Sequence, residues 1–248
     1  MHSAETLLFK GRDQYGDIFV NEEGEKRFLG FATHDEQSAW SKAEPLIPQH
    51  DYIRNMLLVL LWANPKQIIS LGLGAGIINS VLFHRFPQSK QQVVELRQQV
   101  IDVAYKYFQL PMGKRLNIHH DDAFAFIQQA DVKKADIIFS DIYDAKGLND
   151  IQLHNDYLLA CHSKLKHEGW LVLNCWRHHQ SQELIKRLSD LFSQIHTVDT
   201  PSGNWIVFAS NTPKRLSNKA LKDKSKDLNA LLGFSLSSHL NRLKDIKS

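Results

Sequence analysis

The chain has 248 residues, of which 43% are hydrophobic and 23% are charged, a composition that excludes a disordered or fibrous protein. Its first residues, Met1 to Lys10, lack the charged-then-apolar pattern of a signal peptide, and its longest apolar run, Met56 to Ala63, is too short to cross a bilayer. We therefore expect a soluble cytoplasmic protein without a membrane partner, in which Cys161 and Cys175 are core residues.

The charged side chains are unevenly distributed. From Pro213 onward there are nine Lys or Arg and three Asp, whereas residues 1–212 carry 21 basic and 24 acidic side chains. A mildly acidic body suits a cationic substrate, and the basic tail is compatible with a nucleic-acid arm or with an amphipathic helix. Helical spacing of the tail leucines favours a helix that packs against protein over one that binds nucleic acid; these are Leu216, Leu221, Leu228, Leu231, Leu232, Leu236, Leu240 and Leu243.

The first forty residues predict a small β-meander, with short strands over 5–9, 17–20 and 27–32 separated by glycines. After it the pattern changes to longer alternating segments. The predicted boundaries are 1–50 for the meander and a connector, 51–212 for the main domain, and 213–248 for the basic helical tail.

From Asn64 onward, apolar runs alternate with helical segments, which predicts a parallel sheet covered by helices on both faces. Predicted strands span 67–71, 92–96, 116–119, 136–140 and 170–175, and predicted helices span 77–86, 98–108, 123–129, 156–165 and 181–192. A closing hairpin is predicted over 195–199 and 205–209. Seven strands that end in a hairpin are typical of the class I S-adenosylmethionine methyltransferase-like variant of the doubly wound α/β fold.

The first predicted strand of this domain runs into a glycine-rich turn that opens a helix. Gly72, Gly74 and Gly76 allow a tight backbone turn and the close approach of a ligand to the helix N-terminus. Taken alone, the turn is equally compatible with simple packing, because many α/β proteins contain one.

Two acids at the next strand ends make a nucleoside site more specific. Glu95 ends the second strand, where a carboxylate can accept hydrogen bonds from both ribose hydroxyls. Asp122 follows the third strand and can receive the exocyclic amine of an adenine, while Ala123 offers apolar contact to the ring. Asp122 can also act as the N-cap of the following helix, a role that does not exclude the first.

A dehydrogenase would also use glycines followed by an acid about twenty residues later. Here Ile77 stands where the dinucleotide fingerprint needs a small residue, and Asp122 supplies an adenine contact. We therefore favour an adenosyl-sulfonium compound over a nicotinamide cofactor.

The fourth strand ends in two carboxylates, Asp141 and Asp144, beside the predicted nucleoside site. One of them can take a proton from an attacking amine while the other holds a second ammonium group. Tyr143 lies between them and is a further candidate for substrate contact. The alternative is that Asp141 caps the following loop and Asp144 is solvated. The loop from Ala145 to Gln152 is the predicted lid.

These motifs, from about Tyr15 to Ala209, resemble the spermidine synthases, or polyamine aminopropyltransferases. That family carries G-G-G-D-G-G, V-E-x-D, G-D-[AG], D-S-S-D-P and K-P-G-G in this order. The counterparts here are residues 72–77, 94–97, 121–123, 141–145 and 166–169. Further similar segments are the glutamine segment at 37–39, the Y-Q-E-M counterpart at 52–56 and the P-S-G at 201–203.

The resemblance implies ribose binding by Glu95, adenine binding by Asp122, a general base at Asp141 and an amine contact at Asp144. It also implies a cofactor contact at Gln37 and an amine contact at Tyr52. The co-substrate would be decarboxylated S-adenosylmethionine or S-adenosylmethionine, the acceptor an amine, and the protein a homodimer.

The sequence departs from the family at four positions. Ala75 replaces an acid that meets the aminopropyl ammonium, and Thr200 replaces a tyrosine of the amine pocket. Arg97 replaces the acid after the ribose-binding Glu, and Ala145 replaces a proline. The nucleoside half of the site is kept and the polyamine half is eroded.

We therefore predict an aminopropyl transferase, with two alternatives on the same fold: methyl transfer from S-adenosylmethionine, and nucleoside binding without turnover. The pairs His119-His120 and His178-His179 resemble metal ligands, but adjacent histidines at strand edges are usually packing or surface residues, so we expect no metal.

Overall fold

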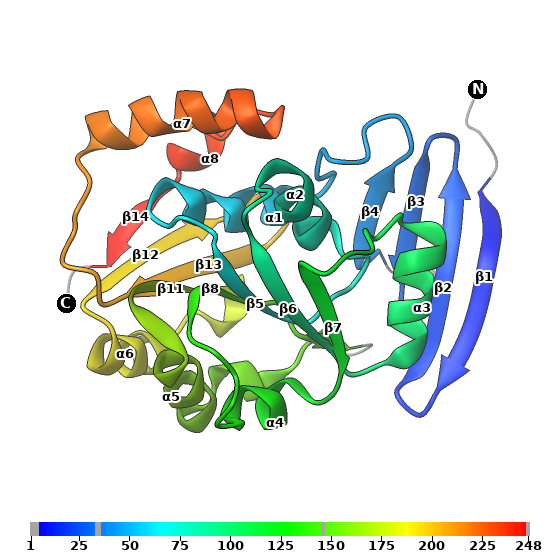
Figure 1. Cartoon of the computed structure of the whole chain (residues 1–248), viewed down its shortest axis with the longest axis horizontal. Coiled ribbons are helices and arrows are strands. Elements are labelled where there is room, and N and C mark those ends of the chain that lie inside the picture. The colour runs from blue at the N-terminus through cyan, green and yellow to red at the C-terminus, as the bar shows by residue number, and fades with distance from the viewer. Residues whose placement is uncertain (1–4, 33–35, 145–146, 247–248) are drawn as a thin grey trace.

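The computed structural model describes residues 5–32, 36–144 and 147–246, with Asp144 described by its backbone only. Its centre is a mixed sheet of eight strands (Figure 1): β5 (Gln67–Leu71), β6 (Lys90–Glu95), β7 (Leu116–His120), β8 (Ala135–Ser140), β11 (Leu165–Trp176), β12 (Gln194–Asp199), β13 (Asn204–Ser210) and β14 (Lys244–Ile246). The strand order is β14-β12-β13-β11-β8-β5-β6-β7, with β13 antiparallel to both of its neighbours. This order confirms the predicted class I fold; β14 is an eighth strand that the sequence did not predict.

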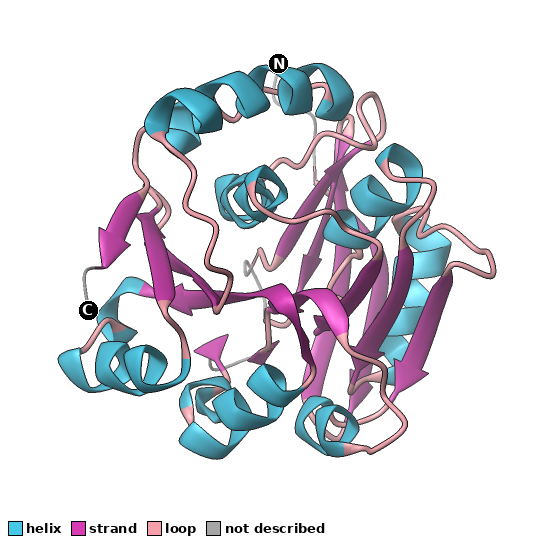
Figure 2. Ribbon diagram, turned by 60° about the vertical axis from the view of Figure 1, so that its left-hand side comes forward, coloured by secondary structure: helices cyan, strands magenta, loops and turns pink. Residues whose placement is uncertain are grey.

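Helices cover both faces of the sheet (Figure 2), because its central strands are apolar on both sides. One face packs against α4 (Ala123–Gln128), α5 (Asn155–Ser163) and α6 (Gln182–Leu191). The other packs against α1 (Asp51–Met56), the 3-10 helix η1 (Leu57–Leu61), α2 (Ile77–Arg85) and α7 (Asn218–Leu232). Along β11, Val172 belongs to one core and Leu171 and Leu173 to the other, as strand alternation requires.

A separate antiparallel sheet lies beside the main one and consists of β1 (Thr6–Asp13), β2 (Gly16–Glu23), β3 (Lys26–Gly30) and β4 (Ser38–Ser41). The first three strands confirm the predicted meander, and β4 was not predicted. Helix α3 (Gln98–Tyr107) packs against β2 as well as against β6 and β7, so it joins the two sheets. Arg97, just before α3, forms an ion pair with Asp13 at 3.0 Å and lies over the Phe31 ring.

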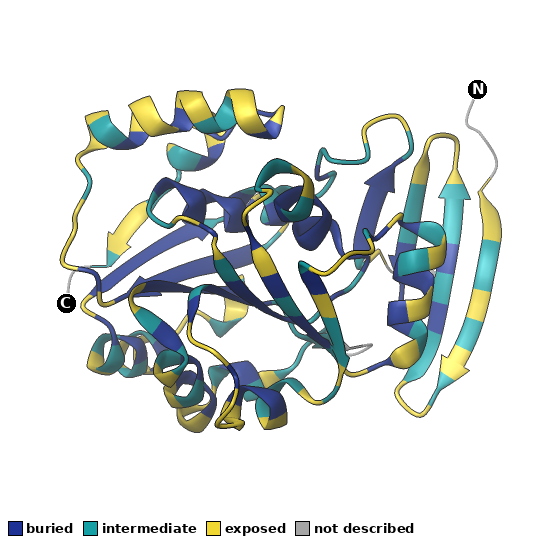
Figure 3. Ribbon diagram, in the orientation of Figure 1, coloured by how far each residue is buried: buried dark blue, intermediate teal, exposed yellow. Residues whose placement is uncertain are grey.

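The tail forms α7, α8 (Ser237–Leu240) and β14, and it packs on the face that carries α1 and α2. Leu221, Leu232 and Leu236 are buried in that core, whereas the outer face of α7 is exposed (Figure 3). The tail is thus helical, as the leucine spacing predicted, except for the last strand. β14 pairs with β12, and Asp245 on β14 contacts the ring of His196.

We expect Leu232→Ala to lower the free energy of unfolding by about 2–5 kcal/mol, because it leaves a cavity under a fully buried side chain. Leu231 is the matched control: it is the neighbouring residue, it is 40% exposed, and its replacement by Ala should cost under about 0.5 kcal/mol. Denaturant unfolding of both variants measures the difference. Equal values would mean that the tail is not part of the cooperative core.

The remaining elements are short: β9 (Tyr143–Asp144), β10 (Gly147–Leu148), and the 3-10 helices η2 (Asp150–Leu153) and η3 (Arg177–His179). Within the described ranges, no helix has the length and apolar character that a membrane crossing requires.

Candidate active site

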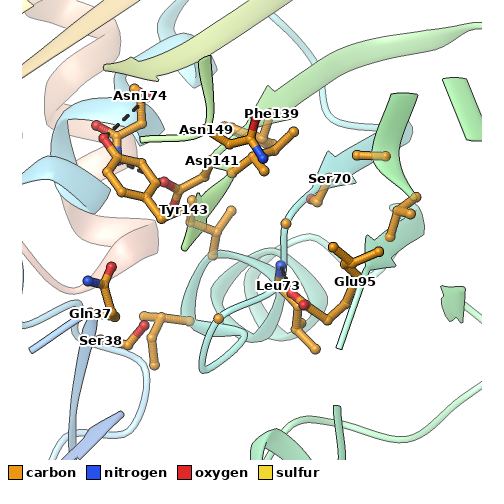
Figure 4. A pocket seen from close by; sticks show the side chains of 18 of the residues that line it. Gln37, Ser38, Ser70, Leu73, Glu95, Phe139, Asp141, Tyr143, Asn149 and Asn174 are labelled. Carbon is orange, nitrogen blue, oxygen red and sulfur yellow. Dashed lines mark hydrogen bonds between the residues drawn. The ribbon is translucent and has the colours of Figure 1, made fainter. Parts of the chain in front are cut away.

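A cavity of about 440 Å³ opens at the carboxyl ends of β5, β6, β8 and β11, where the strand order reverses between β5 and β8 (Figure 4). This reversal is the usual ligand site of an open α/β sheet. Nine of the residues predicted from the sequence line the cavity: Gln37, Tyr52, Gly72, Gly74, Glu95, Asp122, Ala123, Asp141 and Tyr143. Gly76 is not among the lining residues, and the Asp144 side chain lies outside the described part of the structure.

The glycine-rich turn forms the floor of the cavity. Gly72 has φ 95°, and a Cβ there would lie 2.2 Å from the carbonyl oxygen of Asp141, so only glycine lets β5 and β8 end this close together. A Cβ on Gly74 would lie 3.0 Å from the Ser38 Oγ. Gly76 is the N-cap of α2 with φ 72°, and its side-chain position is filled by Leu110. The structure therefore gives Gly76 a packing role and leaves Gly72 and Gly74 beside a ligand.

Glu95 ends β6 and is tied to the turn by two backbone donors. Its Oε2 accepts a hydrogen bond from the Leu73 N–H at 3.1 Å, and its Oε1 accepts one from the Arg97 N–H at 2.9 Å. Burial raises the pKa of the carboxyl, and these hydrogen bonds oppose the rise. Each oxygen keeps a second lone pair, so Glu95 can fix the turn and still accept hydroxyl donors from the cavity.

Asp122 caps α4, because its Oδ1 accepts a hydrogen bond from the Ala125 N–H at 2.8 Å. This is the capping role that the sequence left open. The side chain is exposed at the cavity rim, where Ala123 and Phe124 also line the wall. A cap bond uses one lone pair of one oxygen, so a ligand amine can be bound by the same carboxylate.

Asp141 follows β8 and lies on the cavity wall beside Asn174 and Tyr143 (Figure 4). Its Oδ1 accepts a hydrogen bond from the Asn174 Nδ2 at 2.7 Å. Burial raises the pKa of the Asp141 carboxyl to about 6, and the Asn174 hydrogen bond works against this rise. A carboxylate of this pKa is ionised at neutral pH and is a better proton acceptor than an exposed one.

Two tyrosines stand at the Asp141 end of the cavity. The Tyr143 hydroxyl donates to the Asn174 carbonyl at 3.4 Å, and its ring meets Trp176 edge-on at 5.8 Å. The Tyr52 hydroxyl donates to the Gln37 carbonyl at 3.3 Å, and its ring stacks on His50. This end of the cavity is therefore aromatic, as expected for a pocket that receives an organic amine.

Residues 48–221 match the family model of the spermine/spermidine synthase domain, more than half of the chain. The chain belongs to this family. The polyamine aminopropyltransferase of Chromobacterium violaceum is 28% identical over 92% of this chain and 89% of its own length. The eEF1A lysine and N-terminal methyltransferase of Xenopus laevis is 26% identical over 65% of this chain and 25% of its own length. These curated relatives are named as transferases.

Solved structures agree on the fold. A probable spermidine synthase from Corynebacterium glutamicum has a TM-score of 0.75 at 18% identity, over 89% of this chain and 86% of that one. A spermidine synthase in complex with the transition state analogue AdoDATO has a TM-score of 0.69 at 19% identity, over 95% and 84%. Human methyltransferase-like protein 13 in complex with SAH has a TM-score of 0.68 at 19% identity, over 74% and 93%.

The departures from the spermidine synthase motifs have clear structural consequences. Ala75 is 1% exposed, and its N–H donates to the Ser38 Oγ. Thr200 is fully buried and hydrogen-bonded to the backbone N–H of Asn204, so it packs inside the turn. Neither residue is among the lining of the cavity. Arg97, with its ion pair to the N-terminal sheet, is used to hold the two sheets together.

Sequence reasoning missed several polar residues of the cavity wall: Ser38, Asn149, Asn174, Ser202 and Asn204. Only Asn174 carried a usable signal, because it interrupts the apolar run of β11 and is 2% exposed. A buried polar side chain inside an apolar strand needs a partner, and here that partner is Asp141.

The predicted lid is described from Gly147 onward; Ala145 lies outside the described residues. Its far end is fixed: Gln152 is fully buried, accepts from the Ser140 hydroxyl at 2.7 Å and donates to the Asn174 carbonyl at 3.2 Å. A lid movement therefore stays a prediction and concerns the segment before Gln152. Among the residues that the structure describes, no three His, Cys, Asp or Glu side chains come together as a metal site would require.

Proposed function

We propose that this protein transfers an aminopropyl group from decarboxylated S-adenosylmethionine to an amine. The neutral amine nitrogen attacks the propyl carbon next to sulfur, the C–N bond forms as the C–S bond breaks, and methylthioadenosine leaves with the sulfur electron pair. The observation that carries the proposal is Asp141, a half-buried carboxylate with a raised pKa on the wall of the cavity that Glu95 also lines.

Recognition of the nucleoside is assigned to the β5, β6 and β7 ends. Glu95 would accept hydrogen bonds from the ribose hydroxyls, and Asp122 would accept one from the adenine amine above Ala123. The open backbone of Gly72 and Gly74 lets the sulfonium side of the ligand approach the turn. Gln37, which lines the same cavity, is proposed as a further contact.

Asp141 is proposed as the base because an amine is protonated near neutral pH and must lose a proton to become a nucleophile. Its pKa of about 6 keeps it ionised at pH 7 to 8, and the enclosed wall strengthens its attraction for the ammonium group. Tyr52 and Tyr143 would line the acceptor, and Asp144 would hold its distal positive charge. Most of the rate enhancement would come from alignment of nitrogen, carbon and sulfur.

Methyl transfer from S-adenosylmethionine is the second candidate, and Ala75 favours it. Where the spermidine synthase motif has an acid, this chain has a buried methyl group, so one contact to an aminopropyl ammonium is missing. The same nucleoside grip would serve both reactions. A homodimer and a cytoplasmic location stay predictions.

Calorimetry of the purified protein separates these candidates, with S-adenosylmethionine, its decarboxylated form and methylthioadenosine as ligands. Tighter binding of the decarboxylated form supports aminopropyl transfer, and tighter binding of S-adenosylmethionine supports methyl transfer. Binding of none of the three would exclude both.

We expect Glu95→Gln and Asp122→Ala each to weaken nucleoside binding by about 1–3 kcal/mol, the cost of losing a hydrogen bond to a charged group. Because Asp122 also caps α4, Asp122→Ser is the sharper variant: serine keeps the cap but lacks the carboxylate. Glu183→Gln, on the exposed side of α6, is the control. Calorimetric affinities that match the unmodified protein in both site variants would refute this placement of the adenosine.

A further inference from the structure

Two buried asparagines connect Asp141 to the turn between β12 and β13. Asn174 on β11 is 2% exposed, and Asn204 at the start of β13 is 5% exposed. The Asn204 Nδ2 donates to the Asn174 Oδ1 at 3.0 Å, and the Asn174 Nδ2 donates to the Asp141 Oδ1 at 2.7 Å. Since β11 and β13 are paired neighbours, the sheet itself sets these distances.

The chain of hydrogen bonds has one direction. The carboxylate of Asp141 can only accept, so Asn174 must present its amide nitrogen to it and its amide oxygen to Asn204. Asn204 must then present its own nitrogen to Asn174 and its oxygen away from it. Two hydroxyls meet that oxygen, Ser202 Oγ at 3.0 Å and Thr200 Oγ1 at 3.5 Å.

The far end of the chain is itself fixed. The Thr200 Oγ1 accepts from the Asn204 backbone N–H at 2.9 Å and lies 2.8 Å from the Ser202 Oγ. The Ser202 hydroxyl also reaches the Asp51 carboxylate at the start of α1, at 2.9 Å. Thr200, the residue that departs from the family's tyrosine, therefore contributes to the turn from which Asn204 is oriented.

We propose that Asn174 and Asn204 are positioning residues, which hold the Asp141 carboxylate in one orientation from the turn at residues 200–204. The inference rests on the proposed function, in which Asp141 is the proton acceptor. By occupying Oδ1, the Asn174 amide prevents the carboxylate from rotating and leaves Oδ2 as the oxygen for the amine proton. Donation to the ionised form also favours that form over the protonated one.

The groups around Asp141 give the inference a clean readout. The described titratable side chains that interact with it electrostatically are Tyr52, Tyr143 and Cys175, and burial raises the pKa of each. All three are therefore neutral at the pH where Asp141 titrates. A change in the Asp141 pKa thus reports its hydrogen bonds directly.

The test compares Asn204→Leu with the unmodified protein. Leucine has a similar size and no donor, so the Asn174 amide loses the contact that orients it. We expect the pKa of Asp141 to rise by about half a unit or more, and kcat to fall about 10-fold, with the KM of the donor unchanged. The pKa is followed by titration of the ¹³C-labelled Asp141 carboxyl, assigned by its loss in Asp141→Asn, and by the acid limb of the kcat/KM profile.

Ser202→Ala acts at the far end of the chain and should shift both quantities in the same direction by less; it decides the question if Asn204→Leu does not fold. Asn211→Leu, which lies just beyond β13 outside the cavity lining, should change neither. An unshifted pKa and pH profile in the folded variants would overturn the inference. If the unmodified protein transfers nothing to any amine, the proposed function fails, and the carboxyl titration still decides whether the asparagines orient Asp141.

Discussion

Asp141→Asn is expected to lower turnover by about 10²- to 10⁴-fold, because the amide keeps the shape of the side chain but cannot accept the proton of the amine. Donor affinity should change little, since the nucleoside contacts are assigned to Glu95 and Asp122. In the unmodified protein, kcat/KM should fall as the pH drops below about 6, where burial places the pKa of Asp141. Steady-state kinetics from pH 5 to 9 with calorimetric donor affinity measures all three.

The stability of the same variant provides the control. An acid whose pKa is raised in the folded protein stabilises the fold only while it is protonated, and that stability is lost as the pH rises from the unfolded value of 3.8 to about 6. Asp141→Asn should therefore be more stable than the unmodified protein at pH 8, by about 1–2 kcal/mol after allowance for partial exposure, and equally stable near pH 3. Full activity in the folded variant would remove Asp141 as the base.

The parts of the site that sequence analysis could predict are local in the chain. Gly72 and Glu95 belong to short motifs at successive strand ends, and parallel strands bring their carboxyl ends to one edge. Gly76 shared the motif but serves packing, because a positive φ and a nearby Leu110 explain its need for glycine without any ligand. The motif therefore identified the turn without separating its contacts.

The missed elements lack a local signal. Helix α1 and η1 are largely buried on several sides, so their apolar residues show no helical stripe. β14 has three residues, Lys244–Ile246, with no apolar alternation, and exists through its pairing with β12. Asn204 gained its role only when β13 folded beside β11. Such contacts depend on tertiary pairing, which single-sequence patterns do not contain.

Putrescine is expected to be a poor acceptor, with kcat/KM about 10²- to 10⁴-fold below that of the best amine in a panel. Two amine contacts of the spermidine synthase motifs are absent, at Ala75 and Thr200, and each hydrogen bond to a charged group is worth about 1.5–3 kcal/mol. Thr200 is fully buried in its own turn, so no rotation of its side chain restores the contact. Tyr52, Tyr143 and Trp176 give this end of the cavity an aromatic wall, which favours a larger and less charged amine.

The measurement is a transfer assay with amines of increasing size and decreasing charge, each paired with S-adenosylmethionine and with its decarboxylated form. Comparing both donors matters because the missing acid at Ala75 weakens the hold on an aminopropyl group but not on a methyl group. Tyr143→Phe is an informative variant: it keeps the ring against Trp176 and removes only the hydroxyl, so a larger acceptor should keep most of its rate. Putrescine as the fastest acceptor would show that the remaining carboxylates, Asp141 and Asp144, recognise a diamine without the two lost contacts.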